Sequence, residues 1–373
     1  MAESGQPAAA PTGWWALLPG RTRVILGVAG LAPLGTLLLQ VSGANSVLVF
    51  VVSAIALAGL AALVGEGTDQ IGHRLGPGAT GVLQSALGNL PELFIGFFAL
   101  RAGLVVVIQT ALIGSILANS LLVLGLAFVA GGLRHGVQKF GTSQSRMIST
   151  LVVLSVAALT IPALATAPGA PDEGHAAGLS LVVAIALLVV FAVSIPFSIG
   201  GGPSASVEHA EVDHPWPLPL ALGMLLAAGV GAAFVSDWFV EALKPAMSSL
   251  GLSEGFVGLV IVAIAGNAVE NVVGVQMAMR NKADLAISLI LNSSLQVALA
   301  LIPVMVILSM VLGGPALTLV LSPLLIGALA LAALLGALIV YDGESTWLEG
   351  AALIALYVII AAGVWWGPPI GAH

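Results

Sequence analysis

The sequence predicts an all-α integral membrane protein, built as one bundle of about eleven transmembrane helices. Of its 373 residues, 59% are hydrophobic and only 7% are charged, whereas about a quarter of the residues in soluble domains are charged. The hydrophobic residues form long unbroken runs, which excludes the alternating pattern of a transmembrane barrel. A soluble core could not bury this much apolar surface, so we expect the chain to lie in a lipid bilayer.

Composition excludes several other classes of protein. The chain has no cysteine, so it contains neither disulfides nor a thiolate metal site. The net charge of -7 is scattered and offers no basic face for nucleic acid. The motifs of an enzymatic nucleophile and base are not evident, so we expect no catalytic residues and no enzyme activity.

Each predicted element is an apolar run of about 20 residues, because about 30 Å of hydrocarbon needs roughly that many residues at helical rise. Eleven such runs follow one another, at 23–41, 46–70, 77–101, 104–131, 146–167, 177–199, 216–243, 255–279, 284–311, 315–341 and 347–366. Tryptophans are common at membrane interfaces. Those beside the outermost runs are Trp14, Trp15, Trp365 and Trp366.

The lysines and arginines predict an orientation. Assigned to alternate sides of the eleven spans, eight of them fall on one side: Arg21, Arg23, Arg74, Arg134, Lys139, Arg146, Arg280 and Lys282. The other side receives only Arg101 and Lys244. Because cytoplasmic loops carry the excess of positive residues, we expect a cytoplasmic N-terminus and a C-terminus on the opposite side.

One stretch of the chain occurs twice. GNLPELFIGFFAL, Gly88–Leu100, matches GNAVENVVGVQMAM, Gly266–Met279, at an offset of 178 residues. The same offset relates Ser115 to Ser293. The copies lie on the third and eighth spans, so they cross the membrane in opposite directions. Inverted repeats of this kind are common in secondary transporters, which bind substrate near the midplane.

The repeat predicts the organisation of the chain. We expect an N-terminal tail that is not a cleaved signal, one extra transmembrane helix, a first inverted repeat of five helices, a cytoplasmic linker and a second inverted repeat of five helices. These parts comprise residues 1–22, 23–42, 43–199, 200–215 and 216–373.

The repeated motif carries oxygen ligands. Asn89 and Glu92 lie three residues apart and share a helix face. Pro91 lacks an N–H and is expected to disturb the preceding turn, so that nearby carbonyl oxygens face a cavity. The second copy contributes Asn267 and Glu270. Together the two halves supply carboxylates, amides, backbone carbonyls and the hydroxyls of Ser115 and Ser293.

An all-oxygen set suits a hard cation, and Ca2+ accepts six to eight flexible oxygen ligands. The carboxylates of Glu92 and Glu270 would neutralise one divalent ion. A charged carboxylate at the bilayer centre costs about 3 kcal/mol on insertion scales, so protonation is the natural way to empty the site. Ca2+ and protons would therefore compete, and a site open alternately to each side would exchange them.

Structural interpretations remain open for several of these residues. Gly96 and Gly274 equally suit helix packing, and a serine hydroxyl can bond back to its own helix. Asp69 and Asp237 precede the two motifs and either line a proton or ion route or lie near the interface. The acidic residues of the 205–214 segment are most simply a solvated loop.

With these motifs in place, the chain resembles the Ca2+/H+ antiporter family of the cation/Ca2+ exchanger superfamily. The resemblance rests on GNLPELFIGFFALRAGL, LIGSILANSLLVLG, GNAVENVVGVQMAMRNKADLAISLILNSSLQVAL and YDGESTWLEGAALIALY. It implies ten core helices in two inverted halves, often with an extra N-terminal helix. It also implies that Glu92 and Glu270 are the central cation and proton carboxylates. The residues implied to assist them are Asn89, Asn267, Ser115, Ser293 and Gln296, with Asp69 and Asp237 as acidic residues of the preceding helices.

The sequence departs from the family pattern at three places. Leu90-Pro91 replaces small residues and resembles the motif of Na+/Ca2+ exchangers, although their preceding Thr-Ser pair is absent. Asn271 stands where the family commonly has histidine, and Asn292 where it usually has glycine. The first departure keeps Na+ open as the counter-ion.

The sequence therefore predicts a multi-pass antiporter of the plasma (inner) membrane that exchanges cytosolic Ca2+ for protons. Na+-driven exchange of Ca2+ or another divalent cation is the alternative, and a cation channel is less favoured because the repeat is inverted rather than rotational. The expected partners are Ca2+, protons and the lipid bilayer, with no cofactor and no nucleic acid. A homo-oligomer remains open.

Overall fold

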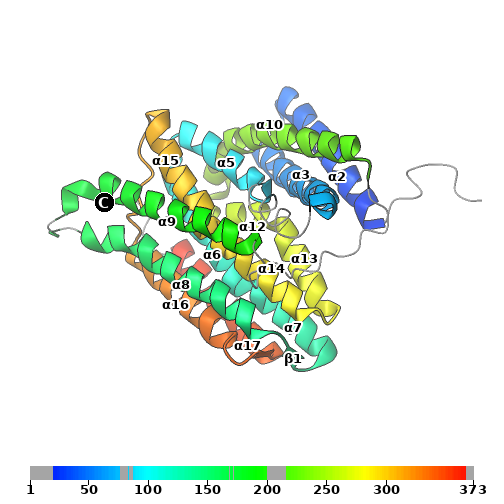
Figure 1. Cartoon of the computed structure of the whole chain (residues 1–373). Helices are drawn as coiled ribbons and strands as arrows, with labels where there is room; N and C mark the ends of the chain where they lie inside the picture. Colours follow the sequence, from blue (N-terminus) through cyan, green and yellow to red (C-terminus); the bar gives the residue numbers. More distant parts are fainter. Residues whose placement is uncertain are drawn as a thin grey trace, which may run out of the picture.

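The computed structural model describes residues 20–75, 83, 87–167, 169–170, 172–199 and 216–366 (Figure 1). Within these ranges the chain is a bundle of helices, as the composition predicts, with one small two-stranded sheet. Most of the predicted tail 1–22 and the predicted linker 200–215 lie outside the described residues. The extra N-terminal helix is described and begins at Gly20.

The elements follow one another in chain order. They are α2 (Gly20–Val41), α3 (Ser46–Leu75), α5 (Leu90–Arg101), α6 (Val105–Leu117), η1 (Ala118–Val123), α7 (Leu124–His135), β1 (Gln138–Lys139), α8 (Thr142–Ala165), η2 (Glu173–His175), α9 (Ala176–Ile199), α10 (Leu218–Leu250), α11 (Glu254–Phe256), η4 (Val257–Val262), α12 (Ala263–Gly266), α13 (Ala268–Met279), α14 (Ala283–Gln296), η5 (Val297–Leu301), α15 (Ile302–Leu312), α16 (Pro323–Ile339), β2 (Glu344–Ser345) and α17 (Trp347–Trp366).

The membrane spans agree with most of the predicted runs. Among the described residues, eight helices are long and apolar enough to cross a bilayer, and a ninth results if the bent pair Glu254–Gly266 and Glu270–Met279 is one span. Pro323–Ile339 is a shorter apolar helix. The third predicted span, 77–101, is described only in part, so the count of eleven stays a prediction.

The tenth span begins later than predicted. The apolar run 315–341 was expected to be helical throughout, but α16 begins at Pro323, where Ser322 accepts a hydrogen bond from the backbone N–H of Leu325. Before it, the backbone N–H groups of Leu317 and Leu319 donate to the hydroxyls of Ser309 and Ser180 on neighbouring helices. In this segment the two N–H groups bond serine hydroxyls instead of helical carbonyl oxygens. Hydropathy alone does not reveal such a substitution.

The offset of 178 residues relates whole elements as well as motifs. Shifting Leu90–Arg101 by that offset gives Ala268–Met279, the bounds of α13. The π-helical turn Ala118–Val123 likewise falls on 296–301, where η5 spans Val297–Leu301. Such turns are rare and concentrate at functional sites, so their recurrence at equivalent positions supports the predicted duplication.

Helix packing is reciprocal between the two halves. α5 packs against α10 and α15, while its counterpart α13 packs against α3 and α7, the counterparts of those two helices. In the same way α17 packs on α7, and its counterpart α9 packs on α15. Likewise α16 packs on α6, and its counterpart α8 packs on α14. Each half thus completes the other, as expected for two interleaved inverted repeats. The extra helix α2 packs mainly along α3.

The loops that follow α7, α13 and α16 meet at one end of the bundle. There β1 and β2 pair antiparallel, and the Nζ of Lys139 lies 2.9 Å from the Oε1 of Glu344. The guanidinium of Arg146 stacks over the ring of Tyr341 and bonds its carbonyl oxygen. The cations that lie on these loops or helix ends are among the eight assigned to one side: Arg134, Lys139, Arg146, Arg280 and Lys282.

A close helix crossing holds the centre of the bundle together. At Gly114 on α6, an added Cβ would lie 2.7 Å from the Cα and 2.8 Å from the carbonyl carbon of Leu259 on η4. Gly258 on η4 faces Thr110 and Val107 on α6 equally closely. Only glycine allows the two backbones to approach in this way.

We therefore expect Gly114→Ala to destabilise the protein. The new methyl group would meet backbone atoms that cannot rotate away, and overpacking of this kind costs about 1–3 kcal/mol. The matched control is Gly336→Ala on α16, where an added Cβ meets nothing within 4 Å and helix propensity favours alanine. Thermal unfolding in detergent should show a lower midpoint for Gly114→Ala only. Equal midpoints for the two variants would contradict the role given to this crossing.

Candidate cation site

At the asparagine of both repeated motifs the backbone departs from the helical conformation. Asn89 precedes α5 with φ -95° and ψ 18°, and Asn267 precedes α13 with φ -93° and ψ 19°. In the second copy the two helical segments are bent by 62°. The two breaks share one conformation although Leu90-Pro91 stands opposite Ala268-Val269.

Proline is therefore not required for the break. We expected Pro91 to disturb the preceding turn, and it lies in the first turn of α5, where its missing N–H would have had no helical partner. Because the second motif breaks at the same place without proline, the Gly-Asn pair shared by Gly88-Asn89 and Gly266-Asn267 is the common feature.

The breaks place the two glutamates at helix N-termini. Glu92 lies in the first turn of α5 and Glu270 in the first turn of α13. The first backbone N–H groups of a helix lack intrahelical acceptors, and the helix dipole is positive there. Each carboxylate therefore lies at the end of its helix that favours negative charge.

The two motifs meet inside the bundle. The side chain of Glu92 crosses to Gly266, where an added Cβ would lie 2.8 Å from its Cγ and 3.2 Å from its Oε1. The missing side chain of Gly266 therefore makes the room that Glu92 occupies. The carboxylates of Glu92 and Glu270 are close enough for the charge of one to act on the other.

A buried hydrogen-bond network joins the halves beside these carboxylates. The Nδ2 of Asn119 donates to the Oδ1 of Asn267 at 3.2 Å and to the Oγ of Ser293 at 3.0 Å. The Nδ2 of Asn267 in turn donates to the Oγ of Ser115 at 2.9 Å and to the carbonyl oxygen of Ala263 at 2.9 Å. Asn119 and Asn267 are fully buried, so the network is screened from solvent.

A second set of contacts extends the network. The Nδ2 of Asn89 donates to the Oε1 of Gln296 at 3.3 Å, and the hydroxyls of Ser120 and Ser294 lie 3.1 Å apart. Three of the residues here and in the previous network were absent from the predicted set: Asn119, Ser120 and Ser294. Asn119 lies in the LIGSILAN stretch, but its counterpart at the repeat offset is Val297, so a search for symmetry passes over it.

Several buried acceptor oxygens have no hydrogen-bond partner among the described residues. They include Oε2 of Glu92, Oδ1 of Asn119 and Oδ1 of Asn271. Most buried polar atoms in folded proteins are paired, and unpaired ones call for an explanation. Carboxylate and amide oxygens are ligands for hard cations, so each of these three oxygens is a candidate ligand for a cation.

The predicted serines and glycines make different kinds of contact. Ser115 and Ser293 bond across the bundle rather than only to their own helices. Gly96 and Gly274 serve packing, because an added Cβ would meet Met305 at 2.9 Å or Ile290 at 2.9 Å.

Asp69 and Asp237 lie apart from the buried network. Both side chains are exposed. Asp237 lines an otherwise apolar cavity of about 850 Å³ between α5 and α10, together with Leu90, Phe94 and Phe98 of α5. Their predicted part in proton movement therefore rests on the sequence alone.

Comparison with known proteins decides the family. The family model for sodium/calcium exchanger protein matches residues 45–200 and 220–366. A Ca2+/H+ antiporter of Synechocystis is 36% identical over 342 residues, which cover 86% of this chain and 92% of the relative. The chain belongs to the Ca2+/H+ antiporter family of the cation/Ca2+ exchanger superfamily.

Solved structures of antiporters agree with this family. The crystal structure of the Ca2+/H+ antiporter protein YfkE superposes with a TM-score of 0.77 at 30% identity, covering 92% of this chain and 99% of that one. The H+/Ca2+ exchanger CAX superposes with a TM-score of 0.74 at 17% identity, covering 92% of each chain, and shows the fold alone. The predicted all-α membrane fold and the resemblance to this antiporter family are thereby confirmed.

Acidic side chains are sparse in the part of the antiporter that the structure describes. Within the described ranges, no group of three or more His, Cys, Asp or Glu residues could hold a metal ion. A cation at Glu92 and Glu270 would therefore depend on amide and hydroxyl oxygens for the rest of its coordination.

We expect Asn119→Ala to destabilise the antiporter more than Ser120→Ala. The first change removes both donors that join Asn267 and Ser293, and a buried acceptor left unpaired costs about 1–3 kcal/mol. In Ser120→Ala, the partner hydroxyl of Ser294 keeps a bond to Ile290 at 3.5 Å. Thermal unfolding of the two variants in detergent measures the difference. A midpoint for Asn119→Ala at or above that of Ser120→Ala would show that the amide does not hold the halves together.

Proposed function

We propose that this antiporter exchanges cytosolic Ca2+ for protons at a midplane site centred on Glu92 and Glu270. One observation carries the proposal: Glu92 of the first motif lies against Gly266 of the second, so the carboxylates of both repeats share one site. The relatives named as Ca2+/H+ antiporters support the choice of ions.

Ca2+ would be held by a mixed set of oxygen ligands. Two carboxylates balance its charge, and the amide, hydroxyl and carbonyl oxygens complete the six to eight ligands that it prefers. The side chains proposed as ligands are those predicted from sequence: Glu92, Glu270, Asn89, Asn267, Ser115, Ser293 and Gln296. The unpaired Oδ1 atoms of Asn119 and Asn271 add two amide oxygens to the candidates.

Protons would empty the site by neutralising the same carboxylates. Without Ca2+, two negative charges would face each other in a region of low dielectric, where both repulsion and lost hydration disfavour ionisation. Protonation removes both costs. Since one set of oxygens cannot hold both cargoes well, Ca2+ and H+ exclude each other, and opening of the site to alternate sides couples their movements.

The repeats would supply that alternation. The reciprocal packing of α5 and α13 on the opposite halves gives two equivalent arrangements of one bundle, and half-helices at the site are typical of such transporters. We further propose two inverted repeats at 43–199 and 216–373, an N-terminus in the cytoplasm and residence in the plasma (inner) membrane. The cluster of cations at one end of the bundle supports this orientation.

The first test replaces each carboxylate. Glu92→Gln and Glu270→Gln should each reduce Ca2+/H+ exchange at least 100-fold in proteoliposomes with an imposed pH gradient, because an amide can neither balance the charge of Ca2+ nor carry the proton. The control, Glu241→Gln, changes an exposed carboxylate that bonds Gln40 and should exchange normally. Normal exchange by either central variant would overturn the site assignment.

A second test concerns pH. Because protonated carboxyl groups do not bind Ca2+, the apparent KM for Ca2+ should rise as the pH on the loading side falls, while the maximal rate at saturating Ca2+ changes less. Initial rates of Ca2+ uptake over a series of pH values measure both constants. An apparent KM that stays constant across the series would contradict competition at one site.

A third test separates protons from sodium. The Leu90-Pro91 pair leaves Na+-driven exchange as the second candidate. We expect a pH gradient to drive Ca2+ uptake in Na+-free vesicles, and an outward Na+ gradient at equal pH to drive none. The reverse result would replace the proton by sodium. An uncoupled Ca2+ current far above the turnover of carriers would instead indicate a channel.

A further inference from the structure

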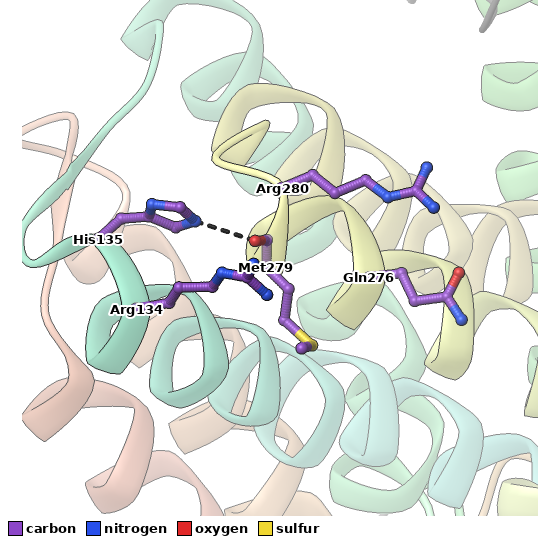
Figure 2. A pocket seen from close by; sticks show the side chains of 5 residues that line it. All are labelled: Arg134, His135, Gln276, Met279 and Arg280. Carbon is purple, nitrogen blue, oxygen red and sulfur yellow. Dashed lines mark hydrogen bonds between the residues drawn. The ribbon is translucent and has the colours of Figure 1, made fainter.

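We propose that a basic pocket at one end of the bundle binds the phosphate of an anionic phospholipid headgroup. The pocket, of about 540 Å³, is lined by Arg134, His135, Gln276, Met279 and Arg280. Figure 2 shows Arg134 and His135 reaching from α7 toward α13, and Arg280 and Gln276 extending from α13. This inference does not depend on the proposed exchange of Ca2+ for protons.

The two arginines are not needed to cap α13. Its last carbonyl oxygens already have partners: those of Gln276 and Met277 accept from the backbone N–H of Arg280, at 3.2 and 3.0 Å. The carbonyl oxygen of Ala278 accepts from the Nε2 of Gln138 at 3.1 Å, and the Nε2 of His135 donates to that of Met279 at 2.9 Å. These acceptors are therefore satisfied without either guanidinium.

The arginines also lack an acidic partner within the described part of the chain. The only ion pair found there joins Lys139 to Glu344. The neighbouring carboxylate of Asp284 accepts from the backbone N–H of Gly141. The guanidinium groups of Arg134 and Arg280 make no hydrogen bond or ion pair with another described residue. Two guanidinium groups beside one pocket are thus left to an external anion.

Phosphate matches these donors. Guanidinium groups bind phosphate oxygens through paired N–H donors, and the amide of Gln276 offers a further N–H from the same side of α13 (Figure 2). Anionic lipids concentrate in the leaflet that faces the cytoplasm, where basic pockets between transmembrane helices bind their headgroups. The pocket lies at the end of the bundle that we propose to be cytoplasmic.

The surroundings favour a lipid over a free phosphate ion. Apolar side chains that flank the pocket are exposed: Leu133 is 70% exposed, Val137 53% and Val272 55%. Val272, Gln276 and Arg280 follow one another at four-residue spacing along one face of α13 and its C-terminal end, so that face changes from apolar to basic toward its end. A phospholipid matches both parts, with its phosphate at the arginines and its acyl chains along the apolar side chains.

A bound headgroup would connect the pocket to the cation site. Arg134 belongs to α7, and Arg280 directly follows α13. Glu270 lies on α13, about 15 Å from Arg280 along the helix axis. The phosphate would therefore bridge the two helices at the end opposite the site, and hold α13 against α7.

The test measures binding to the delipidated antiporter. Phosphatidylglycerol should raise the thermal midpoint of the wild type by several degrees, whereas phosphatidylcholine and inorganic phosphate at the same concentration should not. The shift should fall by more than half in the double variant Arg134→Gln/Arg280→Gln. The charge-matched control, Arg101→Gln/Lys282→Gln, removes two exposed cations that do not line the pocket and should keep the full shift.

Several results would overturn the proposal. They are an equal shift in the pocket and control variants, no shift in the wild type, or a shift produced as well by inorganic phosphate, which would make the pocket a site for a free ion. If the pocket variant does not fold, Arg134→Lys/Arg280→Lys keeps both charges but loses the paired donors. Native mass spectrometry should then show fewer retained phosphatidylglycerol molecules than on the wild type, and equal retention would also overturn the proposal.

Discussion

A carboxylate inside a bilayer is costly unless its charge is balanced, and this constraint organises the centre of the protein. Glu92 and Glu270 lie at the first turns of two half-helices, where backbone N–H groups and the helix dipole favour negative charge. The Oε2 of Glu92 is nevertheless buried without a hydrogen-bond partner among the described residues. The protein thus lessens the cost of the carboxylates without cancelling it, which leaves a role for a cation or a proton.

The rest of the architecture makes this arrangement possible. The breaks at Asn89 and Asn267 create the helix ends inside the bundle, and they share one backbone conformation although only the first is followed by proline. Glycine at position 266 admits the side chain of Glu92. Interrupted helices are tolerated at membrane depth only where the freed backbone groups lie within protein or face a cavity, and the buried amides and hydroxyls provide such surroundings.

A buried hydrogen-bond network also joins the two halves. Asn119 binds Asn267 and Ser293 of the other repeat, and Asn267 binds Ser115 in return. Hydrogen bonds buried in a region of low dielectric are costly to leave unmade, so the two halves are held in register at the site. The basic pocket between α7 and α13 offers a second place, outside the site, where a ligand could act on the helix that carries Glu270.

The sequence by itself determined the membrane class and the family, and it predicted the duplication and the two central carboxylates. These properties depend on composition, on the length of apolar runs and on the constant offset between the two motifs, all of which are visible in the sequence without knowledge of the fold. It also predicted Asn89, Asn267, Ser115, Ser293 and Gln296, five residues that the structure places in buried or partly buried hydrogen bonds.

Only the tertiary structure decided which residues meet. Asn119 pairs with residues 148 and 174 positions away, separations that match neither a helical period nor the repeat offset. Its own counterpart is Val297, so the search for symmetry could not find it. The hydrogen bonds of Asn119 and Asn267 across the interface join non-equivalent residues, so the offset does not reveal them. Pro91 shows the converse: it is conspicuous in the sequence, yet the same backbone break occurs in the second motif, which has no proline.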